Sequence, residues 1–228
     1  PEWQEPQWLA TRAWPAFGAA VRGLHLPANA EDISTAGPGW QRLAYDELLA
    51  GQLALALVRL GQKNQPGRSI AGNGRIRARI ADALPFSLTN SQRTALEEIT
   101  ADLSASHRML RLLQGDVGSG KTLVALMTMA VAVEAGAQAA LMAPTEVLAR
   151  QHAETIAPLA EKAGLTIGLI TGREKGRPRK EVLARLAGGE IDILIGTHAL
   201  FQDDVVFKDL AVAVIDEQHR FGVQQRLA

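Results

Sequence analysis

The 228-residue chain contains no cysteine, which excludes a disulfide framework, a thiolate metal site and thiol catalysis. Its 24 basic and 24 acidic side chains cancel, so the whole-chain charge gives no sign of a nucleic-acid or membrane partner. No apolar run reaches the length of a membrane span, and the first residues lack the charged and apolar regions of a signal peptide. These absences predict a soluble, cytoplasmic protein with no membrane partner.

Aromatic residues are also scarce, at 4%, whereas apolar residues make up 47% of the chain, enough for a packed core. All four tryptophans, Trp3, Trp8, Trp14 and Trp40, lie in the first 40 residues. The composition therefore changes along the chain and predicts two regions. The tryptophans are interpreted as core residues, with base-stacking wedges as the alternative.

The first region, residues 1–83, is predicted to be mainly helical. Apolar spacing indicates a short helix over 16–24 and a long amphipathic helix over 40–60, where leucine recurs every three or four residues. Residues 61–79 contain glycine, proline and basic side chains but no acidic one. They are interpreted as a basic linker.

The second region, residues 84–228, alternates short apolar runs with longer helical patterns, as in βα units on a parallel sheet. Strands are expected at 109–113, 139–143, 166–170, 191–195 and 211–215. Helices are expected at 91–103, 121–135, 146–163 and 179–187. Pro158 should kink or shorten the third of these helices.

One octapeptide in this region matches the P-loop pattern and lies between an expected strand and an expected helix. It consists of Gly115, Asp116, Val117, Gly118, Ser119, Gly120, Lys121 and Thr122. Backbone N–H groups of such a loop and the helix N-terminus bind phosphates. Lys121 would reach the β- and γ-phosphates, and the Thr122 hydroxyl would bind magnesium. The alternatives are a chance glycine-rich turn and a dinucleotide site, but the chain lacks the glycine and acidic pattern of the latter.

A pair of carboxylates follows the last expected strand. Asp216 and Glu217 come directly after 211–215, at the end of a parallel strand where ligands bind. Asp216 would hold magnesium, commonly through a water, and Glu217 would deprotonate the water that attacks the γ-phosphate. Gln218 and His219 would couple the nucleotide to a second ligand. The alternative is a solvated strand-to-helix turn.

Gly-Lys-Thr followed by Asp-Glu-x-His is the pair of motifs found in superfamily two helicases. The sequence segments around them resemble the RecG family of bacterial ATP-dependent DNA helicases. Residues 84–92 are similar to the adenine-side motif, which implies that Phe86, Thr89 and Gln92 bind the nucleotide and that Gln92 reads the base edge. Residues 143–152 are similar to motif Ia. Further motifs at 169–172, 195–200 and 216–223 extend the resemblance over almost all of 84–228.

The resemblance implies a P-loop NTPase fold of the RecA-like type, with ATP and Mg²⁺ as cofactors and with forks, Holliday junctions and other branched duplexes as partners. In such motors loops at the carboxyl end of the sheet hold DNA phosphates. The residues assigned to DNA are Thr145, Arg150, Thr171, Gly172, Thr197 and His198. Thr145 has a competing role as a helix N-cap, and His198 could be a polar loop residue. The basic run 173–180 would either touch phosphate or be a solvated loop.

A whole RecG helicase also has a DNA-wedge domain and a second motor domain with an arginine finger. By this resemblance residues 1–83 hold only the tail of the wedge domain, the long linker helix and the basic linker, and residues 84–228 hold a C-terminally truncated first motor domain. The chain also begins without methionine and stops just after the acidic motif. We therefore expect a fragment that binds nucleotide but is nearly inactive alone. The alternatives are a translocase of the transcription-repair coupling type, a P-loop switch that does not act on nucleic acid, and a non-enzymatic interaction module.

Overall fold

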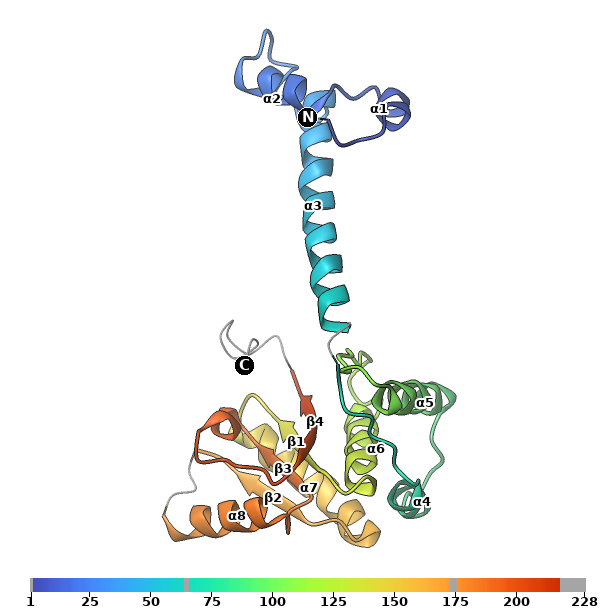
Figure 1. Ribbon diagram of the computed structural model, residues 1–228, viewed down its shortest axis with the longest axis vertical. Helices are drawn as coiled ribbons and strands as arrows, with labels where there is room; N and C mark the ends of the chain where they lie inside the picture. The colour runs from blue at the N-terminus through green and yellow to red at the C-terminus, as the bar shows by residue number, and fades with distance from the viewer. Residues whose placement is uncertain (1, 64–65, 173–175, 218–228) are drawn as a thin grey trace. The chain divides into compact units, whose positions relative to one another are not determined.

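The computed structural model describes residues 2–63, 66–172 and 176–217 of the chain. The residues group into two units, Pro1–Gln65 and Pro66–Ala228 (Figure 1). The boundary expected between residues 83 and 84 therefore falls inside the second unit. Among the described residues, no helix is both long and apolar enough to cross a membrane.

The first unit is helical, as expected. It consists of α1 (Pro6–Arg12), α2 (Phe17–His25) and α3 (Pro38–Lys63), with α2 packed on α3. Its aromatic side chains pack together: the ring centroids of Trp3 and Phe17 lie 4.3 Å apart, and those of Trp14 and Tyr45 lie 5.1 Å apart. Trp3, Trp8 and Trp14 thus pack against other aromatic rings of this unit, but none of the four tryptophans is buried, and Trp3 and Trp40 are exposed.

A buried ionic cluster fastens the start of the chain to α3. The side chain of Arg42 is fully buried and pairs with Asp46 and, at 2.6 Å, with Glu2. The guanidinium also lies over the ring of Trp3, 5.5 Å from its centroid. Because a buried charge is stable only when paired and hydrogen-bonded, this cluster fixes residues 2–4 against the helix.

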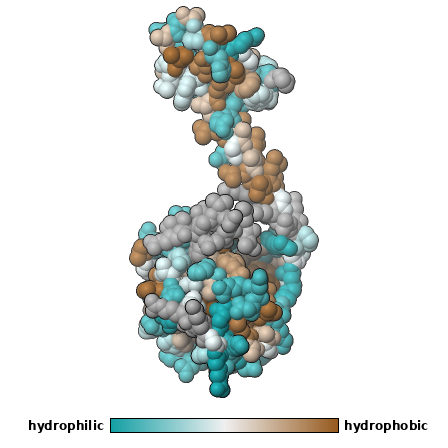
Figure 2. Space-filling model, turned by 90° about the vertical axis from the view of Figure 1, so that its left-hand side faces the viewer, coloured by the Kyte–Doolittle hydropathy of each residue, from teal (hydrophilic) through white to brown (hydrophobic). Residues whose placement is uncertain are grey.

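The middle of α3 is apolar around much of its circumference. Figure 2 shows apolar side chains on the surface of this helix, and the exposed ones are Leu48, Leu53, Leu55, Leu57, Val58 and Leu60. The single-faced amphipathic helix that the leucine spacing predicts is therefore too simple a description.

The second unit is built on a parallel four-stranded sheet in the order β2-β3-β1-β4. The strands are β1 (Gln138–Met142), β2 (Ile167–Ile170), β3 (Ile193–Gly196) and β4 (Leu210–Ile215). Central strand β1 pairs with both β3 and β4, so that Ala139 lies opposite Ile193 on one side and Val212 on the other. Four of the five expected strands are thus present.

Helices cover both faces of this sheet. Successive side chains of β3 point to opposite faces, and they join two different apolar clusters. Ile193 and Ile195 join the larger cluster, to which α6 (Lys121–Glu134) and α7 (Glu146–Ala163) contribute. Leu194 joins the smaller one with Leu186 of α8 (Arg177–Gly188). The helical layer is extended by α5 (Asn90–Ser104), which packs on α6, and a short 3-10 helix, η1 (His198–Phe201), follows β3. Helix α7 continues through Pro158, so the proline does not shorten it.

The strand expected at 109–113 is not formed. The structure describes this whole segment, and it makes no ladder with β4 or with any other described strand. Met109 and Leu113 pack partly on the core, whereas Leu110 and Leu112 are 78% and 77% exposed. The alternation is that of a strand, but a strand also needs the backbone hydrogen bonds of a neighbour, and these are missing here.

Most of the residues expected to form a basic linker belong to the second unit, whereas 61–63 are the last residues of α3. Helix α4 (Arg75–Asp82) begins within the expected linker and buries Ile80, and Ile70 is also part of the core. Glu134 of α6 accepts hydrogen bonds from the backbone N–H groups of Gly74 and Arg77, at 2.8 and 2.9 Å. A carboxylate from another helix thus satisfies the N-terminus of α4.

Candidate functional site

The P-loop forms the turn that leads into α6. Gly118 and Gly120 have φ angles of +81° and +82°, in the left-handed region that glycine adopts without steric cost. Helix α6 begins at Lys121, and its C-terminus is followed directly by the start of β1 at Gln138. Its N-terminus therefore points toward the carboxyl edge of the sheet, where ligands of parallel sheets bind.

The side chain of Lys121 folds back onto the P-loop. Its Nζ donates hydrogen bonds to the carbonyl oxygens of Gly115 and Asp116, at 2.9 and 2.8 Å. Ser119 closes the loop with a backbone bond to the Asp116 carbonyl, at 3.2 Å. The ammonium group is thus held beside the backbone that would surround an anion, which is the arrangement a phosphate site needs.

Gln92 connects the adenine-side motif to the P-loop. Its side chain and that of Thr89 form a capping box at the start of α5, in which Gln92 Oε1 accepts from the Thr89 N–H at 2.9 Å. The other end of the amide, Nε2, donates to the carbonyl of Ser119, also at 2.9 Å. A Cβ at Gly120 would collide with this amide nitrogen. The backbone angle of Gly120 favours glycine, and a side chain there would displace the Gln92 amide from the loop.

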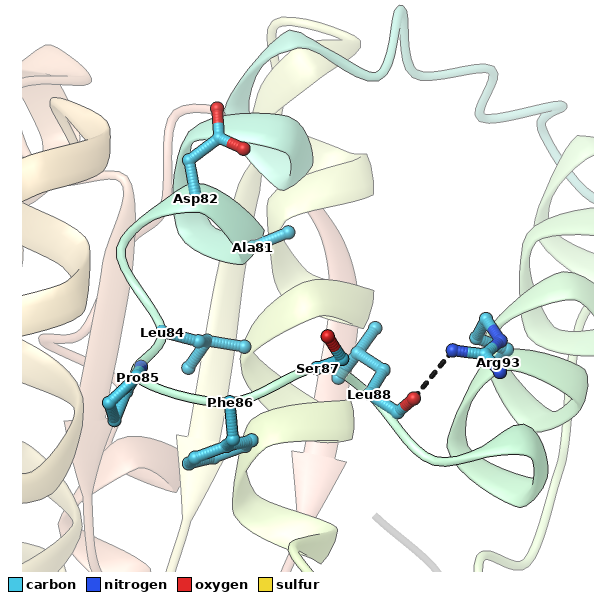
Figure 3. A pocket seen from close by; sticks show the side chains of 8 residues that line it. All are labelled: Ala81, Asp82, Leu84, Pro85, Phe86, Ser87, Leu88 and Arg93. Carbon is cyan, nitrogen blue, oxygen red and sulfur yellow. Dashed lines mark hydrogen bonds between the residues drawn. The ribbon is translucent and has the colours of Figure 1, made fainter.

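A pocket lies beside this motif, on the segment between α4 and α5 (Figure 3). Phe86 contributes an exposed ring to its wall. Arg93 also lines it and donates to the carbonyl of Leu88 at 2.6 Å. An apolar ring beside polar groups is a suitable wall for a planar base. Phe86 lines this pocket and Gln92 does not, and both polar ends of the Gln92 amide are engaged with the protein.

The acidic pair lies at the carboxyl end of β4. The Asp216 N–H donates to the Met142 carbonyl at 2.8 Å, which continues the β1–β4 ladder past the last strand residue. Asp216 Oδ2 lies 2.7 Å from His152 Nε2 on α7. Glu217 has a φ of 52°, a left-handed conformation that is strained for a non-glycine residue and that recurs at active sites. Gln218 and His219, the expected coupling residues, lie outside the described residues.

The donors near this edge fit magnesium bound together with a nucleotide. Thr122 offers a hydroxyl in the first turn of α6, and Asp216 offers a carboxylate on β4, which packs against α6. Within the described residues, no group of three or more His, Asp or Glu side chains could hold a metal ion alone. Mg²⁺ is commonly held by one or two protein oxygens together with phosphates and waters, so this sparse set fits it.

The six residues assigned to DNA differ in accessibility. Thr145 is exposed and caps α7, accepting from the Leu148 N–H at 3.3 Å, and Gly172 and His198 are exposed as well. Arg150 is half-buried. Thr171 and Thr197 are buried, so this structure does not present their hydroxyls to a phosphate, and the Thr197 hydroxyl instead caps η1. Thr145, Gly172 and His198 thus have an exposed surface for this role, and Arg150 has a partly exposed one.

Sequence reasoning assigned no role to His152 beyond its place in motif Ia. It lies on the inner side of α7, between the buried residues Ala149 and Ile156. This helical spacing is the signal that could have directed its side chain toward the sheet. The partner, Asp216, could not be read from spacing because it is distant in the sequence.

Comparison with known proteins places this site in a family. A family model for the DEAD/DEAH box helicases matches residues 89–228, more than half of the chain. The chain belongs to the DEAD/DEAH box helicase family. The α/β fold of the RecA-like type that the sequence predicts is thereby confirmed.

Within this helicase family the chain is similar to proteins called ATP-dependent DNA helicase RecG. The protein of Bacillus subtilis (strain 168) is 48% identical over 214 residues, which are 93% of this chain and 31% of that protein. The Escherichia coli (strain K12) protein is 41% identical over 213 residues, 92% of this chain and 31% of the relative. This chain thus spans about a third of the length of these relatives, and the resemblance to RecG is confirmed.

A solved structure agrees with the sequence relatives. The structure described as RecG bound to a three-way DNA junction superposes with a TM-score of 0.79 at 38% identity. The match covers 97% of this chain and 30% of that chain. The likeness therefore includes the helical first unit as well as the unit with the P-loop.

Proposed function

We propose that this chain is the ATP-binding and hydrolysing part of a DNA helicase motor that remodels stalled forks and branched recombination intermediates. The observation that carries the proposal is the P-loop of Gly115–Thr122, wrapped around Lys121 at the edge of the sheet where Asp216 and Glu217 end β4. Phosphoryl transfer requires a phosphate-binding loop with a lysine and, near it, acidic side chains. Here the loop precedes α6 and the acidic pair follows β4.

In this proposal each group has one task. Lys121 binds the β- and γ-phosphates. Thr122 and Asp216 would hold magnesium, which would supply positive charge beside the phosphates. Glu217 orients the attacking water and accepts its proton. Phe86 and Gln92 bind the adenine side, and Gln218 and His219 couple this site to DNA.

DNA is the proposed partner because the relatives are named DNA helicases and one was solved on a three-way junction. Thr145, Gly172 and His198 are exposed on loops that follow β1, β2 and β3, all at the carboxyl edge. Contacts there would be to phosphates and would not depend on base sequence. We place the protein in the bacterial cytoplasm at the nucleoid, with a wedge domain and a second motor domain as its partners in a longer chain.

The test compares Lys121→Ala with the unchanged chain by calorimetry with ATP and magnesium. Loss of most of the binding is expected, and equal affinity would refute the assignment of the P-loop. A second measurement, ATP hydrolysis by a longer protein that includes the second motor domain, separates a motor from a simple switch. A helicase motor is stimulated by branched DNA, whereas a P-loop switch that does not act on nucleic acid is not.

A further inference from the structure

The carboxylate proposed to bind magnesium is in contact with α7, the helix that carries Arg150 and is capped by Thr145, two residues assigned to DNA. His152 of α7 and Asp216 at the end of β4 are 64 positions apart in the sequence, and their side chains meet at 2.7 Å between Nε2 and Oδ2. Both are partly shielded: the side chain of His152 is 15% exposed and that of Asp216 is 31% exposed. Such a bond is stronger than one on the open surface, because it competes less with water.

The surrounding packing fixes both ends of this contact. Ala149 and Ile156, one turn to either side of His152, are buried in the main apolar cluster, so the register of α7 directs the imidazole inward. The backbone of Asp216 is held by the Met142 carbonyl at the end of β1. The continuous segment of β1 and α7 therefore holds both the main chain and the side chain of Asp216.

We propose that His152 is a positioning residue for Asp216 that holds the carboxylate in the orientation that magnesium binding requires. The proposal rests on the proposed function, since it assigns regulation to the same nucleotide site. At metal sites, residues that hydrogen-bond to a metal ligand orient it, and their loss lowers the affinity for the metal by about 10-fold to 100-fold. Because His152 is on the helix that begins at Thr145, a shift of α7 on DNA binding would move the orienting group for Asp216.

A purely structural histidine would affect something different. Removing it would lower the melting temperature but would leave the ratio between nucleotide affinities with and without magnesium unchanged. A positioning role changes that ratio and leaves the magnesium-free affinity alone. The ratio is therefore the quantity to measure, and it does not depend on turnover.

The experiment titrates a fluorescent ADP analogue into the 228-residue chain, once with magnesium and once with EDTA. His152→Leu should lower the magnesium-dependent gain in affinity by about tenfold. His152→Gln should restore most of it, because its amide nitrogen can occupy the place of Nε2. His152→Asn should not, because its shorter side chain places the donor near Nδ1. Glu154→Gln, an exposed change on the same helix, is the matched control.

A double-mutant cycle completes the test. If His152 acts through Asp216, His152→Leu should have no further effect on the ratio in an Asp216→Asn background. Equal ratios for the Leu, Gln and Asn variants and the unchanged chain would overturn the proposal. If the Leu variant does not fold, the difference between Gln and Asn decides. Nucleotide binding that is insensitive to Lys121→Ala would instead refute the proposed function, so the two failures are distinguishable.

Discussion

Gln92 and Ser119 are joined by a hydrogen bond of 2.9 Å from the side-chain amide to the backbone carbonyl of the P-loop. The same amide also completes the capping box at the start of α5. A residue expected to read the adenine edge therefore also supports the loop that we propose binds the phosphates. If a base recruits the amide of Gln92, it should compete with this hydrogen bond, so we expect occupation of the adenine side to alter the phosphate loop.

The first prediction concerns this double role. Gln92→Ala should weaken ATP binding by about tenfold, since one hydrogen bond to the loop is worth about 1 kcal/mol and the side-chain half of the capping box, the bond from the Thr89 N–H, is lost as well. It should also reduce the preference for ATP over GTP. Calorimetry with both nucleotides measures the two effects. Ser91→Ala, an exposed neighbour, is the control, and an unchanged ATP preference in Gln92→Ala would disprove base reading by Gln92.

The second prediction concerns Glu134, whose side chain is fully buried beside Arg77. Burial favours the neutral acid, but the backbone N–H groups of Arg77 and Gly74 and the Arg77 guanidinium outweigh it and lower the pKa of Glu134. Glu134→Gln removes the charge from these bonds at nearly constant size. It should lower the free energy of unfolding of the second unit by about 2 kcal/mol at neutral pH.

The pH dependence provides a check on this prediction. A lowered pKa in the folded state means that ionised Glu134 stabilises above its ordinary value of 4.5 and that this contribution is lost as the pH falls toward the folded value. Thermal unfolding followed by circular dichroism should therefore show a difference between Glu134→Gln and the unchanged chain that shrinks below about pH 4.5. A difference that stays constant down to pH 3 would contradict the assignment.

The third prediction concerns the first unit, where backbone N–H groups of Gln4 and Phe17, together with the Arg42 guanidinium, lower the pKa of Glu2 to about 2. The stabilisation from ionised Glu2 is complete above its ordinary value of 4.5 and disappears as the pH falls toward 2. All four tryptophans lie in this unit, so their fluorescence reports on it alone. Acid titration should release the aromatic cluster in this range, and Glu2→Gln should flatten the transition.

Elements with a strong local pattern were predictable from the sequence. Helix α7 has the expected bounds, and the P-loop lies at the start of α6 because glycine, lysine and threonine at fixed spacing specify that turn. Helix α4 was missed because its arginines gave the stretch the composition of a linker. The apolar pair Ile76 and Ile80, at helical spacing, carried the correct signal.

Properties that depend on tertiary structure were not predictable. Nothing local distinguishes 109–113 from a strand, since the ladder that defines one needs a bonded neighbour. The burial of Thr171 and Thr197 follows from the packing of the loops after β2 and β3. The contact between His152 and Asp216 joins two motifs that the sequence places far apart.

The last prediction concerns turnover by these 228 residues. Phosphoryl transfer needs charge stabilisation on the γ-phosphate, and an arginine finger supplies about 10³-fold to 10⁵-fold in rate. In RecG-like motors the finger is implied to come from the second motor domain. With Lys121, Thr122, Asp216 and Glu217 but without that domain, the chain should bind ATP with magnesium and yet hydrolyse it very slowly.

The same reasoning applies to DNA. A strand-binding surface supplied by one motor domain should bind DNA weakly and lose affinity steeply with salt. Steady-state ATPase assays with and without forked DNA measure this, and strong DNA-stimulated hydrolysis by residues 1–228 alone would show that the catalytic arginine lies within this chain.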